Sequence, residues 1–292
     1  MVDDTLLGAL IALAIALPLV WKWELGVRRA AVAIVCLCVA WGLLLAAVGS
    51  VTDEVPGWLL VSVASLATAA AFVLYRFYRD PERVAPDRDD VIVSPADGQV
   101  LYVRRSAGGR LPVSSKKGRE HTLEELTKTP LAAGEAVVVG IALNFLDVHV
   151  NRAPVSGTVT VHLHHAGTFG SLKHPDSLLE NERATTIIER DGMQIAVVLI
   201  ASRLVRRIVS FVGVGDQVAH GQRIGAIRFG SQVDLVMPLD WAEGLQVEVG
   251  DRVTAGESIV AVLPKADGES GVLDAAKSAL VGGATDTDRG RS

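Results

Sequence analysis

The sequence predicts a membrane anchor of about three helices (residues 1–78), an all-β domain (79–265) and a mobile tail (266–292). Three observations predict this organisation: long apolar runs at the front, short Val/Ile-rich runs broken by turn residues behind them, and an internal repeat. Half of the 292 residues are hydrophobic. A share this high indicates that part of the chain lies in lipid.

The anchor rests on three apolar segments, residues 5–21, 30–49 and 58–75. Each approaches the roughly 20 residues that an α-helix needs to cross a bilayer. The first is the shortest and contains Pro18, so whether it spans fully is left open. A soluble helical bundle does not account for three such runs in succession.

Charge around the apolar segments predicts their orientation. Basic residues lie between the first two segments and after the third, whereas the second connection is acidic. These residues are Lys22, Arg28 and Arg29, then Arg76, Arg79 and Arg83, with Asp53 and Glu54 in the acidic connection. By the positive-inside rule, the N-terminus faces outward and the large C-terminal domain faces the cytoplasm, at the inner cell membrane.

Composition excludes two classes of protein. The formal net charge of -5 gives no electrostatic basis for nucleic-acid binding. Cys36 and Cys38 lie two residues apart in an apolar helix, where they point to different sides and cannot form a disulfide. The chain is therefore neither a nucleic-acid-binding protein nor a disulfide-stabilised scaffold.

Beyond residue 79, turn residues separate short strands. Ile187-Ile188 and Ile195–Ile200 flank Asp191-Gly192, a strong hairpin signal. Helical periodicity is confined to a short stretch around residues 123–126. The predicted fold class is all-β, with α+β character only at the margins.

An internal repeat refines this prediction. Residues 214–227 and 249–262 share the frame V-G-D-x-V-x-x-G-x-x-I-x-A-[IV], in which Gly-Asp turns alternate with short strands. Such units are typical of hammerhead, lipoyl-like β folds. A carrier domain of that kind needs a lysine at the hairpin tip, and neither copy has one there. The repeat therefore predicts the fold without a swinging-arm function.

Five short stretches carry the chemistry of the β domain. They are Phe77-Tyr-Arg-Asp-Pro-Glu-Arg83, Ser94-Pro-Ala-Asp-Gly-Gln-Val100, Asp147-Val-His-Val-Asn-Arg-Ala-Pro-Val-Ser-Gly157, Glu180-Asn-Glu-Arg183 and Phe229-Gly-Ser-Gln-Val-Asp-Leu-Val-Met-Pro238. In this order the set resembles the phosphatidylserine decarboxylase proenzymes, in their short bacterial form with a Gly-Ser cleavage site. The resemblance covers residues 76–264.

The resemblance implies that the chain cuts itself between Gly230 and Ser231. The Ser231 hydroxyl attacks the Gly230 carbonyl to give an ester, and elimination and hydrolysis then leave a pyruvoyl group at position 231. This covalent cofactor is the electron sink for the loss of CO2 from phosphatidylserine, which gives phosphatidylethanolamine. No metal is needed, and the two fragments stay together as α and β subunits.

The resemblance also implies a general base, His149, oriented by the carboxylate of Asp97. Longer family members carry a second histidine three residues later, where this chain has Arg152. Whether His149 serves both cleavage and decarboxylation, or shares them with His165, therefore stays open. Arg152 and the stretch from Glu180 to Arg183 are not assigned catalytic roles.

Two other classes of function remain as alternatives. His162 and His164 lie on one face of a predicted strand, as in some zinc sites, which allows a membrane-tethered zinc peptidase. A lipoyl-like membrane adaptor is the non-enzymatic alternative. A bound metal would favour the peptidase, and an uncleaved mature chain would favour either. The sequence leaves the lipid tail type and homo-oligomerisation open.

The predicted orientation can be tested with a reporter fused after Ser292. The basic residues that flank the apolar segments place the fusion in the cytoplasm, so a reporter active only in the cytoplasm should function. Alkaline phosphatase at the same position is the control and should stay inactive. A fusion active only in the periplasm would overturn the prediction.

Overall fold

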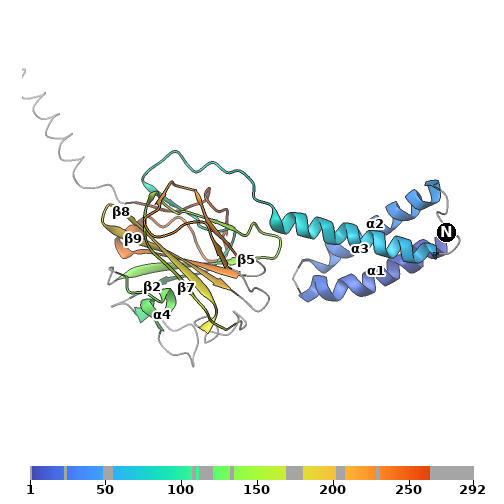
Figure 1. Ribbon diagram of the computed structural model, residues 1–292, viewed down its shortest axis with the longest axis horizontal. Helices are drawn as coiled ribbons and strands as arrows, with labels where there is room; N and C mark the ends of the chain where they lie inside the picture. The colour runs from blue at the N-terminus through green and yellow to red at the C-terminus, as the bar shows by residue number, and fades with distance from the viewer. Residues whose placement is uncertain are drawn as a thin grey trace, which may run out of the picture.

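A computed structural model shows a bundle of three long helices joined to a β-rich domain (Figure 1). It describes residues 2–22, 25–48, 55–106, 110–111, 121–131, 135–168, 180–201, 208–227 and 231–263. The predicted mobile tail, residues 266–292, and the glycine of the predicted cleavage site, Gly230, lie outside these residues. The predicted fold class, three apolar helices before a β domain, is confirmed.

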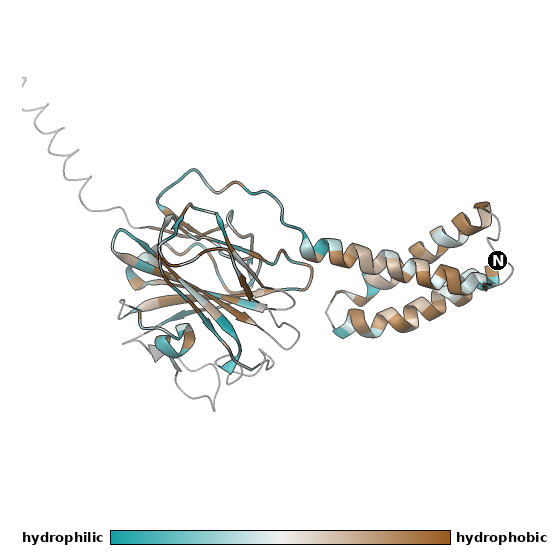
Figure 2. Cartoon of the chain, in the orientation of Figure 1, coloured by the Kyte–Doolittle hydropathy of each residue, from teal (hydrophilic) through white to brown (hydrophobic). Residues whose placement is uncertain are grey.

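The three helices are α1 (Val2–Lys22), α2 (Val27–Val48) and α3 (Gly57–Tyr78). Each is long and apolar enough to cross a membrane, including α1, which continues through Pro18. Figure 2 shows hydrophobic residues all along the bundle. Large apolar side chains such as Leu10 and Leu43 point outward, as expected where the surrounding medium is lipid rather than water.

Small residues let the three helices approach closely. A Cβ atom on Gly8 would lie 3.0 Å from the Trp58 carbonyl oxygen, and one on Gly42 would collide with the Thr5 side chain. The Ser62 hydroxyl donates to the carbonyl oxygens of Trp58 at 2.7 Å and Gly8 at 3.2 Å. Close backbone contact and hydrogen bonds between helices are the interactions that hold helix bundles together in lipid.

The β domain is built on an eight-stranded antiparallel sheet, with strand order β11-β7-β8-β9-β13-β5-β2-β14. Its strands are β2 (Gly98–Arg105), β5 (Ala136–Leu143), β7 (Gly157–His165), β8 (Arg183–Arg190), β9 (Met193–Ala201), β11 (Gln217–Val218), β13 (Ser231–Pro238) and β14 (Arg252–Val253). Asp191 and Gly192 both have positive φ in the β8–β9 turn, which confirms the predicted hairpin.

Smaller elements complete the domain. Three strands form a second sheet in the order β10-β12-β6, and two pairs of strands, β1 with β15 and β3 with β4, form two more. A short helix, α4, has the capping box of Thr122 and Glu125 at its start. The bounds are β1 (Val91–Val93), β3 (Arg110–Leu111), β4 (His121–Thr122), α4 (Leu123–Thr127), β6 (Val150–Arg152), β10 (Ile208–Ser210), β12 (Arg223–Ile227), η1 (Leu239–Gly244) and β15 (Ile259–Val262).

The internal repeat makes the same contacts in both copies. Asp216 O accepts from Val159 N at 2.8 Å, and Asp251 O accepts from Val100 N at 2.9 Å. The partner segments, 93–100 and 152–159, are thus a second duplicated pair that the sequence analysis missed. They also bond to each other, from Val93 N to Pro154 O at 3.0 Å and from Arg152 N to Pro95 O at 2.9 Å. The domain is therefore pseudo-symmetric.

The large sheet separates two apolar layers. Along β13, Val233, Leu235 and Met237 belong to the main core, whereas Val236 faces the layer that includes α4. This alternation follows from the two-residue period of a strand. β13 is therefore a central strand, buried on both faces and paired on one side with β9 and on the other with β5.

A buried carboxylate lies on the α4 side of β13. Asp234 is fully buried and accepts hydrogen bonds from the Tyr102 hydroxyl at 2.9 Å and from Gln232 Nε2 at 2.7 Å. Burial raises the pKa of Asp234 to about 6, although these hydrogen bonds and the charges of Arg104 and Arg183 oppose the rise. The ionised form is therefore the costly one in the folded chain.

This burial predicts a stability that depends on pH. Because the folded pKa of Asp234 lies above the unfolded value, its stabilising contribution is complete below about pH 4 and is lost as the pH rises through about 6. Asp234→Asn keeps an acceptor for Tyr102 and should remove this loss, which is on the order of 3 kcal/mol for a shift of about two pKa units. Thermal unfolding at pH 4 and 7 measures most of it. Asp191→Asn, at an exposed turn, is the control. A wild-type pH dependence in Asp234→Asn would contradict the prediction.

Candidate active site

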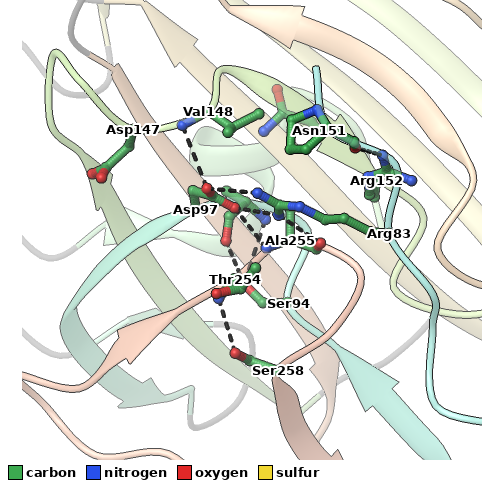
Figure 3. A network of polar contacts seen from close by, with 12 residues as sticks. Arg83, Ser94, Asp97, Asp147, Val148, Asn151, Arg152, Thr254, Ala255 and Ser258 are labelled. Atoms are coloured by element: carbon green, nitrogen blue, oxygen red, sulfur yellow. Dashed lines mark hydrogen bonds and ion pairs between the residues drawn. The ribbon is translucent and has the colours of Figure 1, made fainter. Parts of the chain in front are cut away.

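The Asp97 carboxylate lies in the turn before β2 and is surrounded by donors (Figure 3). Arg83 donates to it twice, from Nη1 at 2.5 Å and from Nη2 at 2.8 Å. The backbone N–H groups of Ala255, at 2.8 Å, and Val148, at 3.4 Å, donate to the same carboxylate. The Arg83 and Asp97 side chains are only 7% and 13% exposed, so this is a largely buried ion pair.

These contacts join three distant segments. Arg83 belongs to the connection after α3, Val148 to the loop before β6, and Ala255 to the second copy of the repeat. Arg83 Nη1 also donates to Ala255 O at 2.8 Å. The carboxylate and its guanidinium partner therefore fix the loop that carries His149.

His149 is 4% exposed, and its Nδ1 lies 2.8 Å from the Asp147 carbonyl oxygen. Because a carbonyl can only accept, Nδ1 carries the proton and Nε2 carries the lone pair. Nε2 is buried and has no hydrogen-bond partner among the described residues. A free lone pair on a fixed imidazole is the form that a general base requires.

Burial lowers the pKa of His149 below its usual value. The Asp147 carbonyl and the carboxylates of Asp147 and Asp97 oppose this effect, and the Arg79 guanidinium adds to it. Because desolvation dominates, the imidazole is neutral near pH 7. Both its tautomer and its charge are thus suited to accepting a proton.

The structure corrects one expectation about this pair. Asp97 does not hydrogen-bond to the His149 ring: both of its oxygens face Arg83 and backbone N–H groups, and the Asp147 carbonyl orients the imidazole instead. Arg83 lies in a stretch that the sequence analysis singled out without assigning it a role. The charge of Asp97 still acts on His149, but through space.

Ser231 is the first residue of β13, with Leu143 of β5 and Ala201 of β9 as its Cα partners. Four residues earlier, Ile227 N donates to the His149 carbonyl oxygen at 3.0 Å. The Cα atoms of Ile227 and Ser231 can be at most about 14 Å apart. The backbone thus brings Ser231 and His149 into one region of the domain.

The end of α3 reaches the same region. The Phe77 ring lies 4.5 Å from the His149 ring, centroid to centroid, and 5.5 Å from the Phe145 ring. Arg79 Nη1 donates to the Leu146 carbonyl oxygen at 2.9 Å. Phe77 and Arg79 belong to the first of the five stretches singled out from the sequence, but their contacts with the loop that carries His149 could not be predicted, because they join segments about 70 residues apart in the chain.

The two arginines left unassigned tie backbone segments together. Arg152 Nη1 donates to Gly221 O at 2.9 Å and its Nη2 to Pro81 O at 3.0 Å. Arg183 is fully buried and donates to Leu126 O at 2.7 Å, in the last turn of α4. Both side chains thus hold distant backbone segments together. His165, the other histidine considered as a base, is exposed at the end of β7.

The histidines of the alternative zinc site have other partners. His162 Nδ1 lies 3.1 Å from Thr186 Oγ1, and His164 Nε2 lies 2.8 Å from Glu182 Oε1. Within the described ranges, no group of three His, Cys, Asp or Glu side chains is placed to hold a metal ion. Nothing in this geometry favours a peptidase.

Comparisons with known proteins all identify the same family. The family model for phosphatidylserine decarboxylase matches residues 70–261. A phosphatidylserine decarboxylase proenzyme of Rhodococcus erythropolis is 42% identical over 202 residues, which are 69% of this chain and 76% of that protein. The proenzyme of Desulfotalea psychrophila is 38% identical over 193 residues, covering 66% and 79% of the two chains, respectively. The proenzyme of Symbiobacterium thermophilum is 38% identical over 209 residues, covering 71% and 86%.

The buried ion pair predicts an asymmetric response to mutation. Asp97→Asn leaves the Arg83 guanidinium buried without its anion, so it should destabilise the β domain by roughly 2 to 4 kcal/mol. Asp90→Asn breaks the Arg88 ion pair, whose side chains are about half exposed (48% and 47%), and should cost under about 1 kcal/mol. Thermal unfolding of the two variants measures the difference. Equal losses in both would contradict a role for Asp97 as the central contact.

Proposed function

Since the chain belongs to the phosphatidylserine decarboxylase family, we propose that it converts phosphatidylserine to phosphatidylethanolamine after cutting itself between Gly230 and Ser231. The observation that carries this proposal is the neutral His149 imidazole, whose buried Nε2 has no partner among the described residues, on a loop tied by its backbone to the segment that leads into Ser231. The other residues of the site hold His149 and its loop in place.

In the cleavage reaction, His149 Nε2 takes the proton from the Ser231 hydroxyl as its oxygen attacks the Gly230 carbonyl carbon. The peptide C–N bond breaks and an ester forms. Removal of the α-proton of residue 231 then breaks the Cβ–O bond and releases the Gly230 carboxylate. One water replaces the nitrogen, which leaves as ammonia, and residue 231 becomes a pyruvoyl group.

The residues present fit this group. It would occupy the first position of β13, where the strand is held on both sides by β5 and β9, so that cleavage leaves both fragments in one sheet. When formed, its ketone supplies the electron sink for loss of CO2. The carbon that loses CO2 must then gain a proton, and His149 Nε2 is the group that would hold it.

The anchor suits a lipid substrate. A diacyl lipid stays in the bilayer, so a site that acts on its head group must lie at the membrane surface. Phe77, at the end of the third apolar helix, contacts His149 directly, which supports a site next to the interface. The basic residues that flank the helices support the cytoplasmic face of the inner membrane. The two fragments are the partners that this proposal requires.

Cleavage is the decisive test of this function. Wild-type protein should give a small fragment, residues 231–292, whose blocked N-terminus resists Edman degradation because a ketone replaces the amine. Ser231→Ala lacks the nucleophile and should stay folded, uncut and inactive. His149→Ala should slow cleavage by about 100-fold or more. Intact mass and a gel time course measure both.

Ser210→Ala, at an exposed strand end, is the matched control and should be cut at the wild-type rate. Decarboxylase activity in a chain that remains one uncut polypeptide would refute the proposal. Normal cleavage of His149→Ala would instead remove His149 from it while leaving the pyruvoyl mechanism in place.

A further inference from the structure

We propose that Phe77, in the last turn of α3, is a positioning residue for His149, so that the third apolar helix forms one wall of the catalytic site. The inference rests on the proposed function, because it assigns meaning to the contact only if His149 is the base. It goes beyond that function because it gives the third apolar helix a role in positioning the base, in addition to its role in the membrane anchor.

The geometry of the contact is specific. Phe77 is only 3% exposed, although it lies at the end of a helix whose neighbouring aromatic side chains, Tyr75 and Tyr78, are 71% and 56% exposed. Its ring is tilted by 38° against the His149 ring, with 4.5 Å between the centroids. Phe145, on the same loop as His149, packs on it as well. Phe77 is thus the aromatic residue of the last turn that faces the domain.

A second contact fixes the same loop to the helix end. Arg79 Nη1 bridges the carbonyl oxygens of Arg76, in α3, and Leu146, in the loop, at 2.8 and 2.9 Å. The loop from 144 to 149 is therefore held by a ring contact and by a hydrogen bond. Movement of the helix end would be transmitted to His149 through both.

His149 needs such support because, among the described residues, one hydrogen bond holds its ring. The bond from Nδ1 to the Asp147 carbonyl fixes one atom, and by itself it would let the ring pivot about that atom. Nε2 has no partner in the described part of the chain that would stop this motion. Packing against the Phe77 ring provides the missing constraint and keeps water from that side of the imidazole.

The charged groups around His149 determine the direction of the pH effect. Asp147, on its own loop, and Asp97, from the turn before β2, favour the protonated ring, while Arg79, after α3, opposes it. Burial is the largest influence and lowers the pKa. Removing the Phe77 ring admits water, so the pKa of His149 should rise. Because the neutral form is the base, the acid limb of the rate profile should move to higher pH.

The test compares Phe77→Ala with Phe72→Ala in the full-length protein reconstituted in lipid. Phe72 lies on the same helix and is 59% exposed, so its variant controls for the loss of a phenyl ring from the anchor. Phe77→Ala should slow cleavage and decarboxylation by about 10- to 100-fold and shift the acid limb upward. Phe72→Ala should match the wild type in both.

Two further measurements separate positioning from general damage. Phe77→Leu restores bulk without a ring and should recover part of the rate. In uncut Ser231→Ala protein, NMR titration of labelled histidine should show a higher His149 pKa when Phe77→Ala is added. Wild-type rates and pH profile in Phe77→Ala would overturn the inference, as would a slower rate with an unchanged profile and an unchanged His149 pKa.

Failure of this inference can be told from failure of the proposed function. If His149→Ala abolishes cleavage while Phe77→Ala does not change it, only the role of Phe77 is lost. If His149→Ala cleaves and turns over normally, the assignment of the base fails, and the contact with α3 loses its catalytic meaning as well.

Discussion

The Arg83–Asp97 ion pair is the contact on which the architecture around the site depends. Burying two charges is costly unless each is paired and its hydrogen-bonding capacity is used, and here the compensation comes from the backbone N–H groups of Val148 and Ala255 as well as from the guanidinium. Because the donors come from the loop before β6 and from the repeat, the pair is stable only when these segments meet. The position of His149, next to Val148, is a consequence of that assembly.

The pseudo-symmetry provides two equivalent positions for such an ion pair, and the sequence places a carboxylate at the first of them. The two duplicated turns have equivalent pairings, with Gly98 opposite Val253 and Gly157 opposite Val218. Asp97 precedes the first glycine, whereas Ser156 precedes the second. The duplication thus provides two equivalent turns. The first of them carries a charged side chain, Asp97, which requires an ion-pair partner. The two halves of this pseudo-symmetric domain thus differ in their side chains and not in their backbone pairing.

Local features of this fold were readable from the sequence, and tertiary ones were not. The apolar helices, the Asp191-Gly192 hairpin and the copies at 214 and 249 follow from composition, turn chemistry and spacing within short windows. The segments at 93 and 152 share little beyond Pro, Gly and alternating apolar residues, so their equivalence emerges only from their hydrogen bonds. The partner of Asp97 could not be predicted from the sequence for the same reason. A carboxylate can pair with any cation that the fold places near it, and here that cation is Arg83 and not His149.

The surroundings of the proposed base, His149, also depend on tertiary contacts that the sequence does not reveal. A histidine that must be neutral near pH 7 benefits from burial, but burial by a polar partner at Nε2 would occupy the lone pair it needs. An apolar cover over the ring meets both requirements, and the end of an apolar helix can supply such a cover. Phe77 occupies that place, while Asp147 supplies the one polar contact on the opposite nitrogen. One structural element, α3, thus belongs to the apolar helix bundle and also covers the His149 imidazole.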